Sequence, residues 1–272
     1  MRYQPKHDPH NGLLHFKASR SLSGYARYFP SSDLAPFIEH YWTVEWDLPQ
    51  PVLRETLPYP SAHIVLEPGV AQLAGVHTKK FSRMLEGKSR VLGVKFLPGG
   101  LRPFVDRPVW AFTDKVVDLG EVFGASAAHL CDVALAHTDH HAAISVVESF
   151  LRERDPRTDA ASSLAARIAQ CIATHRDICQ VEQVATRFEL SIRALQRLFR
   201  EYVGASPKWV ICRYRLQEAA ERMAAADDID WPEIALELGY SDQAHFIRDF
   251  RRLVGTAPAA YFRTLSNAAD TD

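Results

Sequence analysis

One segment of this chain occurs twice in the C-terminal half, with changes. Residues 181–191 read VEQVATRFELS and residues 231–241 read WPEIALELGYS. Each copy is followed by a stretch that ends in an aromatic-and-arginine pattern and then Val-Gly. The simplest interpretation is two copies of one helical supersecondary unit, which predicts an all-α arrangement for this part of the chain.

The first copy predicts two helices separated by a short break at Glu189 and Leu190. Its first helix has one apolar face, made by Val181, Val184, Ala185 and Phe188. Ser191 is a good N-cap for the second helix, and Gly204 is a suitable residue to end it. The second helix buries Leu195, Leu198, Phe199 and Tyr202, and its opposite face presents Arg193, Gln196, Arg197 and Arg200.

The second copy repeats this pattern. Pro232 suits the first turn of its leading helix, and Gly239 ends that helix. Ser241 is the expected cap of the next helix, with Asp242 favourable beside the positive helix start. That helix buries Phe246, Phe250 and Leu253, and it projects Gln243, Ala244, His245, Arg248, Arg251 and Arg252 away from the core.

The outward faces carry the side chains that read base edges in DNA. Arginine donates two hydrogen bonds to guanine, glutamine pairs with adenine, and a helix fits the major groove. A solvated arginine-rich helix face is the alternative interpretation, and the preceding helix and tight turn weaken it. Residues 206–223 predict a connecting helix that starts near Pro207, with Trp209, Cys212, Leu216, Ala219 and Ala220 as its core stripe. Its length of about 30 Å approaches the roughly 34 Å of one DNA turn.

The N-terminal half has the pattern of short strands. Trp42, Val44, Trp46 and Leu48 alternate with polar residues, which predicts a strand with one buried face. Residues 62–66 and 91–97 are further strand candidates, and residues 122–135 and 142–151 are expected to be helical. The charged stretch 152–159 contains a proline and is the expected linker. The aromatics Tyr41, Trp42, Trp46, Phe96 and Trp110 are expected to pack in a core rather than line a pocket.

The predicted fold class is therefore α+β. Residues 1–157 are expected to form a β-rich domain with trailing helices, for effector binding or dimerisation. Residues 158–266 are expected to form an all-α DNA-binding domain of two helix-turn-helix units joined by a long helix.

Composition restricts the protein class. Hydrophobic residues make up 47% of the 272 residues and charged residues 24%, as in globular proteins. The formal net charge is −1, so any DNA-binding surface must be a local basic face. The N-terminus has no apolar signal region and the chain has no long apolar run, so we expect a cytoplasmic protein with no membrane partner. The four cysteines form no CxxC pair, and we expect reduced thiols.

The C-terminal residues resemble the AraC/XylS family of bacterial transcription regulators. The resemblance rests on LSIRALQRLFR (190–200), GASP (204–207), YRLQEA (214–219), IALELGYSDQAHFIRDF (234–250) and GTAPAAY (255–261). It implies base reading by Arg193, Gln196 and Arg197 in the first unit, and by Gln243, Ala244, His245 and Arg248 in the second. Ala244 departs from a hydrogen-bonding role, because alanine can only contact a thymine methyl group. The first 157 residues resemble the β-rich domains often joined to such units.

The resulting hypothesis is a sequence-specific transcription regulator that binds double-stranded DNA and is modulated through its N-terminal domain. Arg193, Gln196, Arg197 and Arg248 are expected to contact bases, and Arg200, Arg251, Arg252 and Lys208 to contact phosphates. A small-molecule effector, RNA polymerase and a second copy of the chain are further partners that the sequence leaves open.

An enzyme is the alternative, as a metal- or ligand-dependent cupin-like domain fused to a DNA-binding module. His63, Glu67 and His77 lack the His-x-His spacing of a cupin metal site. We therefore expect no catalytic residue, no metal and no cofactor. A protein-interaction module that has lost DNA binding is the third interpretation, and the retained arginines argue against it.

Overall fold

The N-terminal part of the chain folds into a six-stranded antiparallel sheet. The computed structural model describes residues 24–225 and 228–269. Its strands, in the spatial order β1-β2-β5-β3-β4-β6, are β1 (Ala26–Tyr28), β2 (Ile38–Thr56), β3 (His63–Glu67), β4 (Val70–Ala74), β5 (Phe81–Phe96) and β6 (Val116–Asp118). The three strand candidates of the sequence coincide with parts of β2, β3 and β5 to within one residue, so the predicted β-rich region is confirmed.

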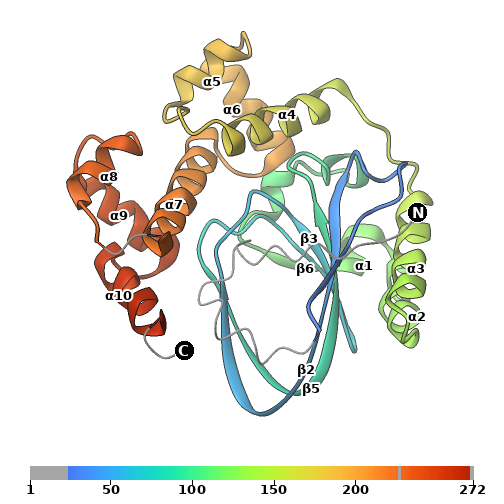
Figure 1. Ribbon diagram of the computed structural model, residues 1–272. Coiled ribbons are helices and arrows are strands. Elements are labelled where there is room, and N and C mark those ends of the chain that lie inside the picture. Colours follow the sequence, from blue (N-terminus) through green and yellow to red (C-terminus); the bar gives the residue numbers. More distant parts are fainter. Residues whose placement is uncertain (1–23, 226–227, 270–272) are drawn as a thin grey trace.

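The long pair of β2 and β5 determines the shape of the sheet. It runs from Ile38 opposite Phe96 to Thr56 opposite Phe81, with a register shift between Leu48 and Val52. Two prolines lie within this shift, where the missing N–H groups interrupt the ladder. Figure 1 shows the two strands curving together at the lower end of the sheet.

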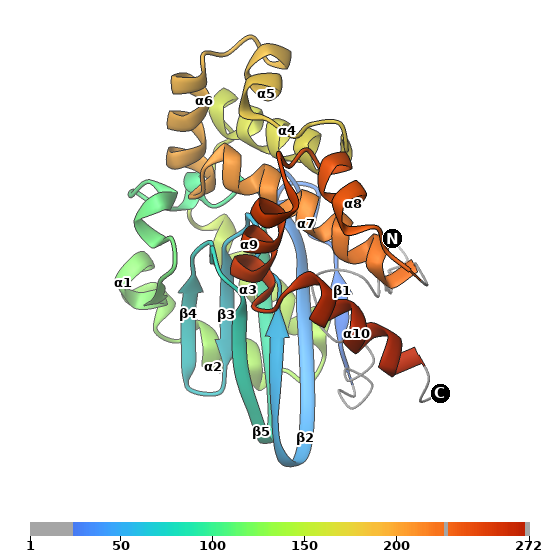
Figure 2. The same ribbon diagram turned by 90° about the vertical axis from the view of Figure 1, so that its left-hand side faces the viewer.

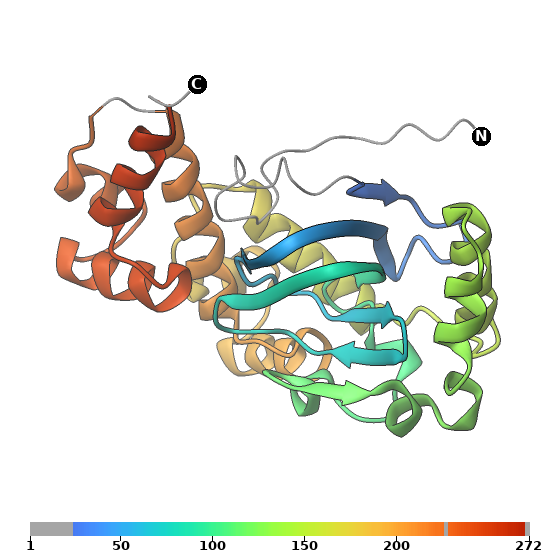
Figure 3. The same cartoon turned by 90° about the horizontal axis from the view of Figure 1, so that it is seen from below.

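Helices cover the outer face of the sheet. The trailing helices are α1 (Leu119–Phe123), α2 (Leu130–Ala136) and α3 (His140–Arg152). Figure 3 shows α2 and α3, in light green, on one side of the sheet and the C-terminal helices on the other. The expected continuous helix over 122–135 is interrupted after α1, because Gly124 has a φ of 75° that a right-handed helix excludes.

The predicted alternation in β2 holds only in part. Trp46 and Leu48 are buried as expected, Trp42 and Val44 are half-buried, and Thr43 on the opposite face is buried as well. The imidazole Nδ1 of His140 lies 3.4 Å from the Thr43 hydroxyl, so the N-terminus of α3 covers this face. A strand with both faces covered cannot be recognised from its alternation alone.

Gly93 in the middle of β5 leaves space for the indole of Trp42 on the facing strand β2. A Cβ atom at Gly93 would lie 1.9 Å from the indole ring. The indole nitrogen of Trp42 donates a hydrogen bond to Nδ1 of His63 at 3.3 Å. The missing side chain of Gly93 therefore leaves the space that the Trp42 indole occupies.

The C-terminal part is helical, as predicted. Its helices are α4 (Ala160–Thr174), α5 (Val181–Arg187), α6 (Ile192–Leu198), α7 (Pro207–Ala225), α8 (Trp231–Glu237), α9 (Gln243–Val254) and α10 (Pro258–Ala269). A π-helical turn, Phe199–Val203, extends α6 to Gly204, whose left-handed φ of 83° ends it. The hydroxyl of Ser191 caps α6, as expected, by accepting a hydrogen bond from the N–H of Ala194 at 3.1 Å.

The cap of α9 differs from the expected one. Asp242, not Ser241, accepts the hydrogen bond from the N–H of His245 at 2.7 Å. A carboxylate at a helix N-terminus interacts with the positive end of the helix dipole as well as with the N–H group, which a serine hydroxyl does not. The same N–H group lowers the pKa of Asp242.

The helical part packs directly against the sheet part. The hydroxyl of Thr113 donates to the carbonyl of Gly204, and the indole of Trp209 donates to the carbonyl of Thr78. Ser162 at the start of α4 donates to the carbonyl of Gly99. In the described residues no helix is long and apolar enough to cross a membrane.

We predict that Gly93→Ala destabilises the protein by about 1–3 kcal/mol, the usual cost of overpacking a filled core. Trp42→Leu should make room for the new methyl group, so Gly93→Ala should cost less in that background. The midpoint of urea unfolding measures both effects. Equal costs in the two backgrounds would show that the indole does not impose this constraint.

Candidate nucleic-acid interface

The first basic face lies on α6. Leu195 and Phe199 are fully buried and anchor the helix on the core that α4, α5 and α7 share. Three of the expected base-reading side chains project from the other face and are exposed: Arg193, Gln196 and Arg197. Among the described residues these three side chains have no hydrogen bond or ion pair. The face is therefore available to a partner.

The fourth arginine of this face, Arg200, has a different environment. Its guanidinium carbon lies 4.4 Å from the ring centroid of Trp110. Trp110 belongs to the short 3-10 helix η3 (Val109–Phe112) of the N-terminal part. Arg200 is exposed, but it stacks on the other half of the protein rather than standing free.

The second basic face lies on α9. Ala244, Arg248, Arg251 and Arg252 are exposed, whereas Gln243 and His245 are half-buried. Arg248 and Arg251 have no hydrogen bond or ion pair among the described residues. The helix is held by Phe246 and Phe250, which are fully buried.

Asp249 places a negative charge inside this second face. Its carboxylate lies 3.1 Å from Arg252 Nη2 and 3.5 Å from His245 Nε2. The sequence analysis did not weigh this residue, although Asp249 follows directly after Arg248. Two of the side chains expected to contact DNA are therefore already paired within α9, which sets it apart from α6.

Helix α7 separates the two faces. Figure 2 shows α5 and α6 at one end of it and α8 and α9 towards the other. Its 19 residues correspond to about 28 Å at 1.5 Å per residue. Leu216 and Ala219 of the predicted stripe are buried, and Trp209, Cys212 and Ala220 are partly buried. Burial raises the pKa of the Cys212 thiol to about 11; all four cysteines are free thiols.

The sequence analysis missed three buried charged residues on α7, which are Arg213, Arg215 and Glu218. Their spacing of two and three residues does not follow the apolar stripe, so periodicity alone treats them as surface positions. A charged residue on a helix is ordinarily exposed unless it is paired. Each of these three has partners on other elements.

Arg215 and Glu218 fasten α4 to α7. Arg215 Nη1 donates to Glu218 Oε2 at 2.8 Å, and its Nη2 donates to the carbonyl of Ile172 at 3.2 Å. Glu218 also accepts from Arg222 at 2.7 Å and lies 3.6 Å from Arg176 Nη1. Because Ile172 lies near the C-terminal end of α4, the network closes the last turn of α4 onto the middle of α7.

The residues considered for other kinds of site are structural. Tyr41, Trp46 and Phe96 are buried in the cores, as expected, and Trp42 is half-buried. The expectation is wrong for Trp110, which is 45% exposed because its ring stacks on Arg200 at the surface instead of entering a core. Glu67, considered for a cupin-like metal site, pairs with Arg83 instead. In the described residues no group of three or more His, Cys, Asp or Glu side chains is arranged to hold a metal ion.

Two family models match the chain. Residues 184–264 match a family described as a helix-turn-helix domain. Residues 26–118 match a domain family of unknown function, DUF6597. The transcriptional activator RhaS of Escherichia fergusonii is 32% identical over 119 residues, which are 42% of this chain and 40% of that protein. RhaS of Klebsiella pneumoniae is 30% identical over 133 residues, which are 45% of this chain and 47% of that protein.

The C-terminal region of this chain is a helix-turn-helix domain of the AraC/XylS family. The matched segment contains both basic faces and the whole of α7. The chain spans less than half the length of these RhaS relatives.

Two solved structures are also similar. The C-terminal domain of AraT, a response regulator from Geobacillus stearothermophilus, is 30% identical with a TM-score of 0.33, over 36% of this chain and 82% of that one. ToxT of Vibrio cholerae is 10% identical with a TM-score of 0.40, over 88% of this chain and 100% of that one. These TM-scores are too low for either structure to support the fold described above.

We predict that Glu218→Ala lowers the free energy of unfolding by about 3–5 kcal/mol, because it leaves the Arg215 guanidinium buried without its carboxylate. Glu221→Ala is the matched control. Glu221 also pairs with Arg176, at 3.5 Å, but its side chain is 40% exposed, so its loss should cost less than about 1 kcal/mol. Equal losses in urea unfolding would contradict the importance of the buried network.

Proposed function

We propose that this protein is a cytoplasmic, sequence-specific transcription regulator. Residues 158–266 bind double-stranded DNA, with α6 and α9 in adjacent major grooves. Residues 1–157 respond to an effector or mediate dimerisation. The observation that carries the proposal is the exposed face of α6, on which Arg193, Gln196 and Arg197 stand without a partner in the described part of the chain.

The length of α7 supports reading of adjacent grooves. A helix of about 28 Å, with a basic face near each end, is close to the roughly 34 Å that separate successive major grooves on one side of a duplex. The two faces are also held on a common frame, since the cores of both units include residues of α7. The relatives named as transcriptional activators agree with this function.

The basic side chains divide into two groups. Arg193, Gln196, Arg197 and Arg248 are proposed to contact base edges, and Gln243, Ala244 and His245 complete the reading face of α9. Arg200, Arg251, Arg252 and Lys208 are proposed to contact phosphates, which adds affinity but no sequence preference. Because Asp249 pairs with His245 and Arg252, α9 should discriminate fewer base pairs than α6.

We propose that the chain acts by binding rather than by catalysis, as the activators it resembles do. A contact with RNA polymerase and a homodimer belong to the same proposal.

We predict that Arg197→Ala and Arg251→Ala weaken DNA binding in different ways. Arg197→Ala should cost about 1–3 kcal/mol at the preferred site and relax one base preference, because a bidentate base contact is lost. Arg251→Ala should weaken all sequences alike and reduce the salt dependence of log Kd by about 1, because a phosphate contact is lost. Selection from random duplexes, followed by titrations at several salt concentrations, measures both.

Lys88→Ala is the control for this experiment, because it removes an exposed positive charge on the sheet, far along the chain from α6 and α9. It should leave DNA affinity unchanged. An Arg197→Ala variant with the parental sequence preference would refute the base-reading role of α6.

We also predict that Trp110→Ala tightens DNA binding by about two- to fivefold, the equivalent of one exposed cation–π contact. Arg200 must leave the Trp110 ring to reach a phosphate, so removing the ring removes that cost. Val116→Ala, an exposed apolar residue on β6, is the control. The gain should vanish in a Trp110→Ala, Arg200→Ala double variant. An affinity that falls or stays constant in Trp110→Ala would show that Arg200 does not exchange between the two partners.

A further inference from the structure

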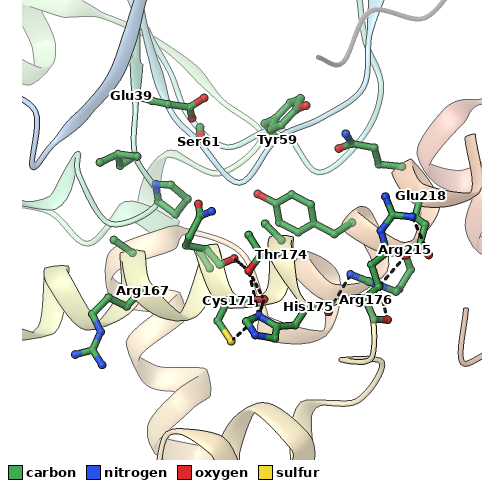
Figure 4. A pocket seen from close by; sticks show the side chains of 18 of the residues that line it. Glu39, Tyr59, Ser61, Arg167, Cys171, Thr174, His175, Arg176, Arg215 and Glu218 are labelled. Carbon is green, nitrogen blue, oxygen red and sulfur yellow. Dashed lines mark hydrogen bonds and ion pairs between the residues drawn. The ribbon is translucent and has the colours of Figure 1, made fainter. Parts of the chain in front are cut away.

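A cavity of about 920 Å³, lined by both apolar and polar groups, lies between the sheet part and the helical part of the protein. Figure 4 shows Glu39, Tyr59 and Ser61 on one wall, from the sheet side. The opposite wall is formed by residues of α4 and α7, among them Arg167, Thr174 and Arg215. The volume is within the usual range of small-molecule sites.

Most charged groups that line the cavity are already paired. Lys95 Nζ donates to Glu39 Oε1 at 3.0 Å, and Arg215 donates to Glu218 at 2.8 Å. Burial alone would raise the pKa of Glu39, but the hydrogen bonds and positive charges of His40 and Lys95 outweigh burial and lower this pKa to about 2. The carboxylate is therefore ionised near neutral pH. Only its Oε1 atom is engaged by Lys95 and His40. Its Oε2 atom remains able to accept a hydrogen bond from a bound molecule.

Three further lining groups have no hydrogen bond or ion pair with another described residue. They are the Ser61 hydroxyl, the Tyr214 phenol and the Arg167 guanidinium. Ser61 is only 5% exposed as a residue, and it lines the cavity. Burial raises the pKa of Tyr214 to about 12, which keeps the phenol protonated as a hydrogen-bond donor. Arg167 adds a positive charge that no acidic side chain of the described residues neutralises.

We propose that this cavity binds a small organic acid that carries several hydroxyl groups. Its carboxylate would pair with Arg167, and its hydroxyl groups would bond to Glu39, Ser61 and Tyr214. A purely apolar ligand would form no hydrogen bond with these polar groups. An acid group adds an ion pair with Arg167 that a neutral ligand does not form.

The site is also connected to the DNA-binding helices. The Tyr59 ring lies 4.1 Å from Lys95 Nζ and 3.6 Å from the guanidinium carbon of Arg213 on α7. Arg213 in turn donates to the carbonyl of Pro58 at 2.8 Å. A ligand that contacts both walls therefore stabilises this arrangement of sheet and α7. This regulatory role, unlike binding itself, rests on the proposed function.

The test is a thermal-unfolding screen of the full chain with probes that differ by one chemical group. The hydroxylated acids are D-gluconate, D-glucuronate and L-tartrate. D-glucitol lacks the acid, and hexanoate lacks the hydroxyl groups. At about ten times its Kd a binding probe should raise Tm by about 2–4 °C. We expect a rise with at least one hydroxylated acid and none with glucitol or hexanoate.

Two variants locate the effect. Arg167→Ala should abolish the rise in Tm without changing the Tm of the unliganded protein, because Arg167 is exposed and has no partner among the described residues. Arg157→Ala is the matched control, since it removes an exposed arginine of the segment before α4, outside the cavity, and should keep the rise. No rise with any hydroxylated acid, or an equal rise in Arg167→Ala, would overturn the proposal.

DNA affinity measured on the same preparations separates this inference from the proposed function. If the protein binds DNA but no hydroxylated acid raises Tm, the cavity proposal alone fails. If a hydroxylated acid raises Tm only when Arg167 is present but no DNA is bound, the cavity proposal stands and the regulator proposal fails.

Discussion

The arrangement of this protein depends on two buried guanidinium groups of α7, two residues apart. Arg213 reaches towards the sheet, where it meets the Pro58 carbonyl and the Tyr59 ring. Arg215 reaches towards α4, where it meets the carbonyl of Ile172, and it pairs with Glu218 one turn further along α7. A guanidinium removed from water is costly unless acceptors surround it. These contacts therefore favour one placement of α7 relative to both the sheet and α4, and with it the placement of the two basic faces.

This arrangement makes the sheet part more than an attached domain. Besides Arg213, it contacts the DNA-binding region at Trp110, which stacks on Arg200, and at Thr113, which bonds to Gly204 at the end of α6. Contacts of this kind give a molecule that binds between the two parts a physical means of changing the DNA-binding surface. The size of such an effect is limited by the difference in affinity of that molecule for the two arrangements.

The two copies of the helical unit have diverged in chemistry while keeping their fold. Buried aromatic residues hold both second helices, and each is preceded by a short helix and a capping residue. The face of α6 is basic and unpaired within the described residues, whereas α9 neutralises part of its charge through Asp249. This one carboxylate makes the two faces differ in charge although the two units share a fold.

Local patterns in the sequence were sufficient to predict four features of the C-terminal region. These are the two helical units, the break at Glu189, the cap at Ser191 and the outward-facing arginines. These features depend on helical periodicity and on hydrogen bonds within a few residues, which short segments encode. Only the tertiary structure decided that Thr43 is covered, that Arg213 and Arg215 are buried, that Arg200 stacks on Trp110, and that a cavity opens beside Ser61. Each of these depends on which distant segment packs against the residue, and no spacing along the chain specifies that partner.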